Sequence, residues 1–138
     1  MKKANRELIQ ARYEAVNAHD FERFQSFYAD SVVWRDPGLA RPVRGPRAVR
    51  SRLATWAAVV PNLKWRLDDL FGEGDRVCAQ FTFTGSHEGA LTDGRGNELA
   101  PTNRTIRLQG VGVYSIDEGK IVDSRIYFDL GQFGASRS

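Results

Sequence analysis

The chain has 138 residues, of which 41% are hydrophobic and 27% are charged. This length and composition are typical of one folded domain, which we place over residues 1–138, and they exclude a disordered chain. The net charge of +3 is too small to favour nucleic acid as a partner. No apolar run approaches the roughly 20 residues that a membrane span needs, so no membrane contact is expected.

Few side chains are available for disulfide or metal chemistry. Cys78 is the only cysteine, so no disulfide can form within the chain, and this favours a reducing, cytoplasmic compartment. The two histidines, His19 and His87, do not stand at the spacing of metal ligands. The sequence also lacks a glycine-rich phosphate-binding loop, so we expect neither a metal nor another cofactor.

The first half of the chain carries helical signals. Ile9, Tyr13 and Val16 recur at i, i+4 and i+7, as on one face of a helix. Asp20 suits a helix N-cap, and Pro46 suits the first turn of a helix. The expected elements are a helix over about residues 3–18, a short helix over 21–28, a strand over 32–34 and a helix over 46–60.

The second half carries strand signals, with turns at 72–75 and 117–119. The expected strands cover residues 63–71, 76–85, 105–116 and 120–129. Residues 87–104 show no clear period, and the tail from 130 to 138 is expected to be frayed. Helices first and strands afterwards predict an α+β fold. We expect a curved, mostly antiparallel sheet shaped like a cone, with three N-terminal helices on one side and a pocket at its open end.

Short motifs along the chain resemble known families. Three motifs resemble the nuclear transport factor 2-like superfamily, and ketosteroid isomerases in particular: Ala11-Arg12-Tyr13, Tyr28-Ala29-Asp30 and Asp36-Pro37. Two further motifs, Gly85-Ser86-His87-Glu88-Gly89 and Gly119-Lys120-Ile121-Val122, resemble the SnoaL-like polyketide cyclases. The resemblance covers nearly the whole chain and implies the same cone-shaped, cystatin-like fold. It also implies a homodimer formed through the convex face of the sheet.

The resemblance implies roles for individual residues. Tyr13 matches the tyrosine that donates to an oxyanion in ketosteroid isomerases, and Asp36 matches their general base. The second oxyanion-hole acid of that family falls on Gly112. The acid/base aspartate of the SnoaL-like cyclases falls on Ile126. Each of these chemistries therefore lacks at least one member in this sequence.

Each candidate catalytic residue also has a structural interpretation. Asp36 beside Trp34 is our first choice for a base, but an Asp-Pro turn can use its side chain to cap backbone N–H groups. Tyr13 can donate to an oxyanion or can simply be buried on its helix. His87 is a candidate acid or base or a solvent-facing loop histidine, and Asp129 is a candidate at a pocket rim or a strand end.

A further set of residues is predicted to bind the substrate. Gly110 and Gly112 share one face of a strand, where missing side chains would deepen the cone, although a β-bulge is an equal explanation. Ile126 and Phe128 share a strand face that is expected to be apolar. The complete set predicted to contact a small hydrophobic ligand is Trp34, Trp56, Phe81, Gly110, Gly112, Ile126 and Phe128.

Two functions are consistent with these residues. The first is a cofactor-free isomerase or cyclase that acts on a hydrophobic, carbonyl-containing molecule, polyketide- or steroid-like, by proton transfer. The alternative is a binding or partner module that keeps the pocket without the chemistry, which Gly112 and Ile126 favour. Five arginines between Arg41 and Arg52 are interpreted as a solvated surface or as contacts for an acidic partner.

Overall fold

A computed structural model describes residues 1–135 of the chain, and part of the tail predicted to be frayed, residues 136–138, lies outside the described residues. The elements in chain order are α1 (Lys3–Asn17), α2 (Phe21–Ser26), β1 (Tyr28–Arg35), β2 (Val43–Arg44), α3 (Pro46–Val59), β3 (Lys64–Glu73), β4 (Arg76–Ser86), β5 (Leu91–Thr92), β6 (Glu98–Leu99), β7 (Thr105–Asp117), β8 (Lys120–Phe128) and α4 (Gln132–Ala135). The predicted α+β class is confirmed.

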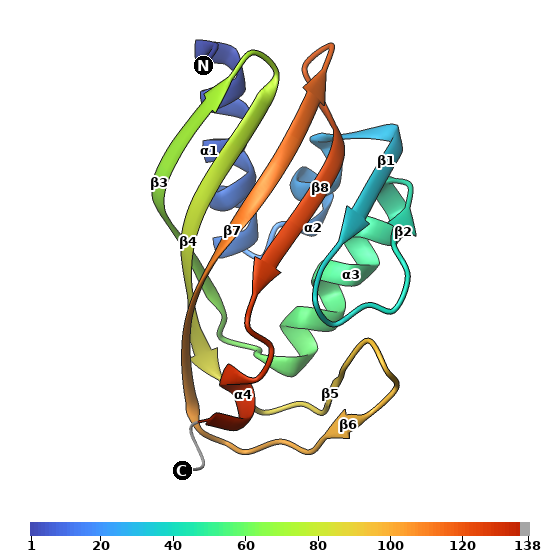
Figure 1. Cartoon of the computed structure of the whole chain (residues 1–138), viewed down its shortest axis with the longest axis vertical. Coiled ribbons are helices and arrows are strands. Elements are labelled where there is room, and N and C mark those ends of the chain that lie inside the picture. Colours follow the sequence, from blue (N-terminus) through green and yellow to red (C-terminus); the bar gives the residue numbers. More distant parts are fainter. Residues whose placement is uncertain (136–138) are drawn as a thin grey trace.

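The main sheet has the strand order β2-β1-β8-β7-β4-β3. Only the pair β1 and β8 is parallel, and the other pairs are antiparallel. Helices α1, α2 and α3 lie on one side of this curved, open sheet, while α4 lies at the end of the molecule opposite the N-terminus (Figure 1). Within residues 1–135, no helix combines the length and apolarity needed to cross a membrane.

The helices begin where local chemistry predicts. The Asp20 carboxylate accepts the backbone N–H of Arg23 at 3.1 Å, which caps α2. Pro46 occupies the first turn of α3, directly after Gly45, whose φ of 88° is a left-handed conformation that glycine adopts at little cost. Both of these start signals are confirmed.

Three segments differ from the prediction because distant partners decide them. β1 begins at Tyr28 rather than at Val32, since Tyr28 pairs with Ile121 of β8 and the strand gains hydrogen bonds there. The segment 87–104 contains the hairpin β5–β6. The tail forms the short helix α4, whose Phe133 is fully buried.

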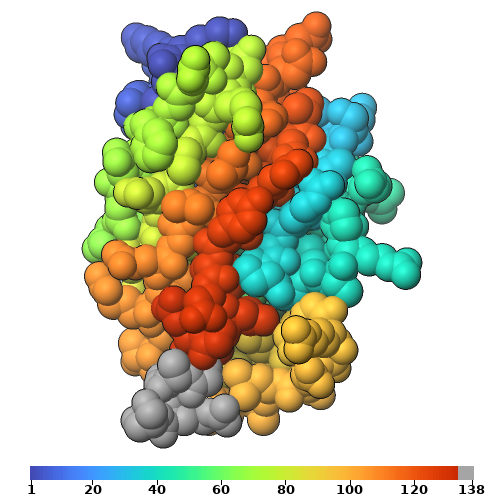
Figure 2. Space-filling view, in the orientation of Figure 1, coloured from blue at the N-terminus to red at the C-terminus, as the bar shows by residue number. Residues whose placement is uncertain are grey.

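The strand register sorts side chains onto two faces of the sheet. On the helix-covered face, Gly112 pairs with Ala79 on one side and with Ile126 on the other. On the opposite face, Val113 pairs with Cys78 and with Arg125. The predicted apolar face of β8 is thus confirmed, because Ile126 is buried. The opposite face is formed by strands, with none of the described helices in front of it (Figure 2).

Candidate functional site

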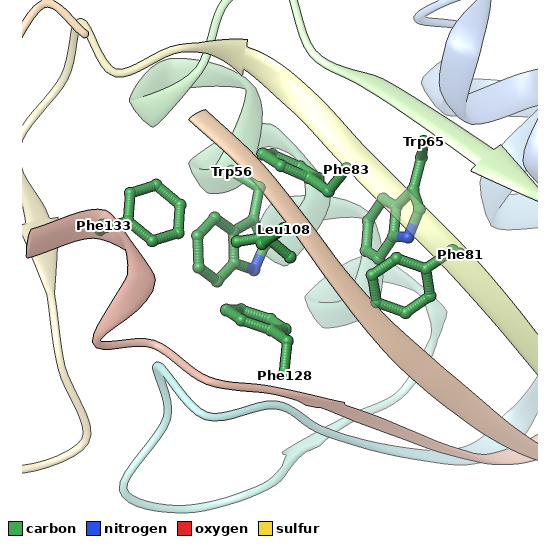
Figure 3. Close-up of a pocket in the computed structure, with 7 residues that line it drawn as sticks. All are labelled: Trp56, Trp65, Phe81, Phe83, Leu108, Phe128 and Phe133. Atoms are coloured by element: carbon green, nitrogen blue, oxygen red, sulfur yellow. The ribbon is translucent and has the colours of Figure 1, made fainter. Parts of the chain in front are cut away.

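An aromatic cavity lies between α3, the sheet and α4 (Figure 3). Its volume is about 10 Å³, and its lining residues are Trp56, Trp65, Phe81, Phe83, Leu108, Phe128 and Phe133. This is room for about one water molecule. The predicted ligand-sized void is therefore not seen in this structure, because aromatic side chains occupy the space inside the sheet.

The two strand glycines explain how the interior became filled. A Cβ atom on Gly112 would lie 2.6 Å from the hydroxyl oxygen of Tyr114 and 2.8 Å from two of its ring carbons. A Cβ atom on Gly110 would collide with the backbone carbonyl oxygen of Tyr127 and would lie 2.7 Å from the ring of Phe81. Both glycines admit a neighbouring ring against the sheet, so the expectation that they enlarge the pocket is corrected.

The Gly112→Ala variant is expected to lose about 1–3 kcal/mol of unfolding free energy, because the fully buried Tyr114 ring cannot move aside freely. Chemical denaturation of the two proteins measures this loss. In a Tyr114→Leu background the ring is absent, and Gly112→Ala should then be nearly neutral. An equal loss in both backgrounds would show that the ring is not the cause.

The predicted ligand-contact residues fall into two groups. Trp56, Phe81 and Phe128 line the cavity. Trp34 and Ile126 are buried but are not among its lining residues. The Trp34 ring instead packs against Phe24, with ring centres 6.3 Å apart, in the core beneath α2.

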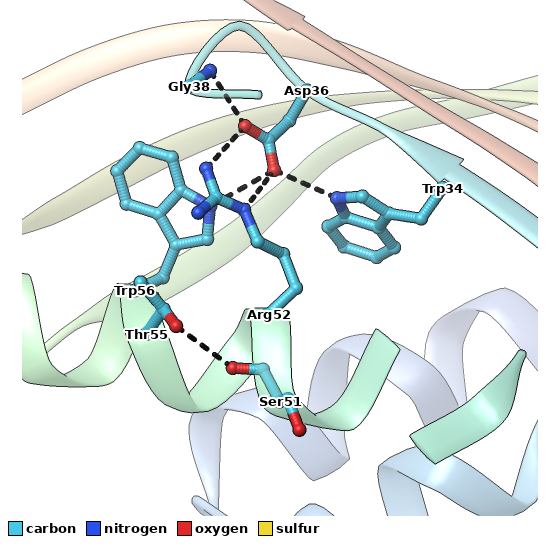
Figure 4. A network of polar contacts seen from close by, with 7 residues as sticks. All are labelled: Trp34, Asp36, Gly38, Ser51, Arg52, Thr55 and Trp56. Carbon is cyan, nitrogen blue, oxygen red and sulfur yellow. Dashed lines mark hydrogen bonds and ion pairs between the residues drawn. The ribbon is translucent and has the colours of Figure 1, made fainter. Parts of the chain in front are cut away.

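Asp36 is the centre of a buried polar network at the end of β1 (Figure 4). Its carboxylate accepts two hydrogen bonds from Arg52, both at 2.7 Å. It also accepts the indole N–H of Trp34 at 2.8 Å and of Trp56 at 3.3 Å, and the backbone N–H of Gly38 at 2.8 Å. Its side chain is 1% exposed. Every lone pair of this carboxylate is engaged.

The network determines the charge of Asp36. Burial by itself would raise the pKa of Asp36, but the hydrogen bonds and positive charge of Arg52, with those from Trp34 and Gly38, lower it. A base needs a pKa near the working pH and a free lone pair. These contacts favour a structural anion that joins β1 to α3, and they do not favour the predicted base role.

Tyr13 belongs to a second buried polar cluster, which lies between α1 and the sheet. Its hydroxyl lies 3.2 Å from that of Tyr114, and burial raises the pKa of both phenols, so both stay protonated donors. The adjacent Arg12 is also fully buried, and its Nε donates to the Tyr28 hydroxyl at 3.1 Å. Sequence reasoning had placed Tyr13 correctly on the buried face of the first helix.

His87 is fully buried rather than solvent-facing. Its Nδ1 lies 3.1 Å from the hydroxyl of Thr102, while Nε2 has no hydrogen-bond partner within the described residues. Its ring centre is 5.4 Å from that of Phe133, which lines the cavity. Burial lowers the pKa of His87 and outweighs the opposite effect of a hydrogen bond with the Gly89 backbone, so the imidazole is neutral at pH 7.

The remaining candidates lie apart from the cavity. Asp129 is exposed, and its carboxylate accepts the backbone N–H of Gly131 at 2.9 Å in the turn before α4. In the basic cluster, Arg52 turns inward to Asp36, and the exposed members are Arg41, Arg44, Arg47 and Arg50. Within residues 1–135, no group of three or more metal-ligating side chains is assembled.

The family profile described as SnoaL-like polyketide cyclase matches residues 7–134 of the chain. The chain belongs to this family. Among curated proteins, none matches it.

Solved structures share the fold of this SnoaL-like protein. A candidate polyketide cyclase from Xanthomonas campestris pv. campestris is 24% identical, with a TM-score of 0.83 over 99% of this chain and 98% of its own. IdmH from Streptomyces antibioticus is 22% identical, with a TM-score of 0.80 over 96% and 97%. TerC, co-crystallised with polyporic acid, is 24% identical, with a TM-score of 0.74 over 96% and 97%. At these identities the likeness establishes the fold alone.

Two features of this SnoaL-like protein escaped the sequence analysis. Arg12 lies three residues after Ile9 and four before Val16, so a charge stands on the apolar face of the first helix, and that signal was available. Phe133 carried no such signal, because its role depends on where the short tail helix docks.

Proposed function

We propose that this SnoaL-like protein is a cofactor-free isomerase or cyclase that moves a proton on a hydrophobic, carbonyl-containing small molecule. The observation that supports this most is the environment of His87. A buried, neutral imidazole whose Nε2 has no partner among residues 1–135, next to an apolar and mostly aromatic cavity, is suited to abstract a proton from carbon.

The proposed step is a proton transfer through an enolate. In the tautomer whose Nδ1–H donates to the Thr102 hydroxyl, Nε2 of His87 takes the proton from the carbon next to the ligand carbonyl. The electron pair of the broken C–H bond moves onto the carbonyl oxygen. The imidazolium then returns the proton to another carbon in an isomerisation. In a cyclisation the enolate carbon instead attacks a second carbonyl, and the imidazolium protonates the new alkoxide.

Ligand entry requires a rearrangement at the cavity. Because the present volume of about 10 Å³ holds no organic molecule, side chains must move first. Phe133 belongs to a four-residue helix near the chain end, so its displacement breaks fewer contacts than moving a strand would. TerC, with the same fold, was crystallised with polyporic acid, which supports a small organic ligand here.

Deuterium exchange tests the proposal without knowledge of the natural substrate. The protein is incubated with 2-tetralone, an aromatic bicyclic ketone, in D₂O, and NMR follows the loss of the protons next to the carbonyl. We expect exchange faster than in matched buffer, because His87 removes a proton and returns a deuteron. Exchange at the buffer rate by a protein that binds 2-tetralone would contradict the proposal.

That negative outcome would support the alternative, a non-catalytic binding module of the same fold. Three observations favour it. Gly112 and Ile126 stand where related enzymes carry acid/base residues, and Asp36 is held in an ion pair with Arg52. A bound ketone recovered without deuterium is the result that this alternative predicts.

We also propose a homodimer through the uncovered face of the sheet. Phe71 and Tyr127 on its strands are half exposed, at 50% and 51%, and a second copy docked on this face would cover both side chains. Tyr127→Glu is expected to convert a dimer into a monomer in light scattering at micromolar concentration. Arg47→Glu, on the helix side of the sheet, is the matched control and should leave the dimer intact. A monomeric wild-type protein would contradict this proposal.

A further inference from the structure

A cluster of buried hydrogen-bond donors surrounds Arg12 between α1 and the main sheet. We define this Arg12 cluster by its members Arg12, Tyr13, Trp65, Tyr114 and Ser124. The guanidinium is enclosed by aromatic rings, with its central carbon 4.7 Å from the ring centre of Tyr13, 5.0 Å from that of Trp65 and 5.2 Å from that of Tyr114. Arg12 itself is 0% exposed.

Among the described residues, the positive charge of this cluster has no negative partner. Nη1 and Nη2 of Arg12 have no hydrogen-bond partner within residues 1–135. Among the described residues, Asp36 is the one buried carboxylate, and the Trp34 ring lies between it and Arg12. Arg52 already neutralises Asp36. Arginine keeps its proton in proteins, so this part of the core carries a net charge of about +1. Contacts with ring faces offset only part of the cost of burying that charge.

The neighbouring unpartnered atoms are suited to the same kind of ligand atom. The indole N–H of Trp65 and the hydroxyl of Ser124 are buried without hydrogen-bond partners among the described residues. Ser124 pairs across the sheet with Tyr114 and with Trp34, which places it beside the guanidinium. An indole N–H can only donate, as can the two guanidinium nitrogens, so the cluster presents more donors than acceptors.

We propose that the Arg12 cluster binds an anionic oxygen of the ligand. The substrate class is then an apolar, aromatic molecule that carries a carboxylate, a phenolate or an ionised enol. This inference rests on the proposed function, because the ligand must reach the cluster through the aromatic cavity. Trp65 belongs to both: it lines the cavity and lies over Arg12. Turning the rings of Trp65 and Phe81, whose centres are 5.1 Å apart, joins the two spaces.

The inference assigns Arg12 a role in ligand binding. A permanent cation next to the Tyr13 and Tyr114 hydroxyls holds an anionic oxygen more strongly than two neutral donors do.

A matched pair of probes tests the inference on the wild-type protein. 2-Naphthoate and 2-naphthamide share one ring system and differ in charge, and calorimetric titration gives both affinities. We expect the naphthoate to bind roughly 10- to 100-fold more tightly, as for hydrogen bonds to charged groups. The preference should persist when salt is raised, because buried charges are poorly screened. Equal affinities, or a preference for the amide, would overturn the anion inference while the pocket stands. Failure of both probes to bind would overturn the pocket and the inference together.

Two variants then locate the effect. Arg12→Gln removes the charge and should abolish the preference for the naphthoate while the amide still binds. Arg50→Gln removes an exposed guanidinium of α3 and should leave the preference unchanged. A folded Arg12→Gln protein with the full preference would overturn the assignment to Arg12. If that variant does not fold, the wild-type comparison decides the inference by itself.

Discussion

The Asp36→Asn variant is expected to lose about 3–5 kcal/mol of unfolding free energy, as when one partner of a buried ion pair is removed. The Arg52 side chain is 11% exposed and would keep its charge without a counter-ion. The neutral amide would also replace one acceptor oxygen by a donor group facing N–H groups. Urea denaturation followed by tryptophan fluorescence measures the change.

A matched variant separates the network from a general effect of removing negative charge. Asp30→Asn changes an exposed carboxylate and should cost less than about 1 kcal/mol. In the double variant Asp36→Asn, Arg52→Met the uncompensated charge is gone, so part of the stability should return. If Asp36→Asn were as stable as Asp30→Asn, the network would not be the structural anchor described here.

Acid should reveal the same ion pair in the wild-type protein. The pKa of Asp36 in the folded state lies below its ordinary value of 3.8, so the folded state favours the ionised form. This contribution to stability is present above about pH 4 and is lost as the pH falls through the lower, folded pKa. Unfolding free energies measured from pH 6 to pH 2 should therefore fall more for the wild type than for Asp36→Asn.

In the His87→Gln variant, the enzyme-dependent rate of deuterium exchange into 2-tetralone is expected to fall by about 10²- to 10⁴-fold. This is the usual loss when a general base is removed. Glutamine keeps a polar side chain of similar length but cannot accept a proton. His19→Gln changes an exposed histidine outside the cavity and should leave the rate unchanged. An undiminished rate in a folded His87→Gln protein would remove His87 from the mechanism.

The pH dependence of the exchange rate gives an independent test of His87. The neutral imidazole is the active form, and burial lowers its pKa below the ordinary 6.5. The enzyme-dependent rate should therefore be level from pH 8 down to about 6.5 and should fall only at lower pH. A loss of rate that begins above pH 6.5 would point to another base.

Several elements of this fold could be predicted from the sequence because neighbouring residues decide them. The first and third helices carry apolar side chains at helical spacing, and Asp20 and Pro46 mark two helix starts. The hairpin turns are also local. β1 could not be bounded in the same way, since its first residues become a strand only when Ile121 of β8 lies beside Tyr28.

The candidate site was predictable as a list of residues but not as an arrangement. Tyr13 and His87 were recognised from their chemistry, yet nothing near them in the chain shows that one meets Tyr114 and the other meets Phe133. Asp36 was predicted to be a base from its match to ketosteroid isomerases and its place beside Trp34. Its partner Arg52 could not be recognised within a cluster of five arginines whose other members are exposed.

By itself, the sequence indicated the family through short motifs that resemble it. It also determined the order of the longer helices and strands and which face of each is apolar, because these follow from local propensity and periodicity. Only the tertiary structure decided that the interior is filled, that Asp36 is paired with Arg52, and that Arg12 meets no counter-ion within residues 1–135. Those facts depend on which side chains meet across the core, and contacts between residues distant in the chain leave no periodic signal in it.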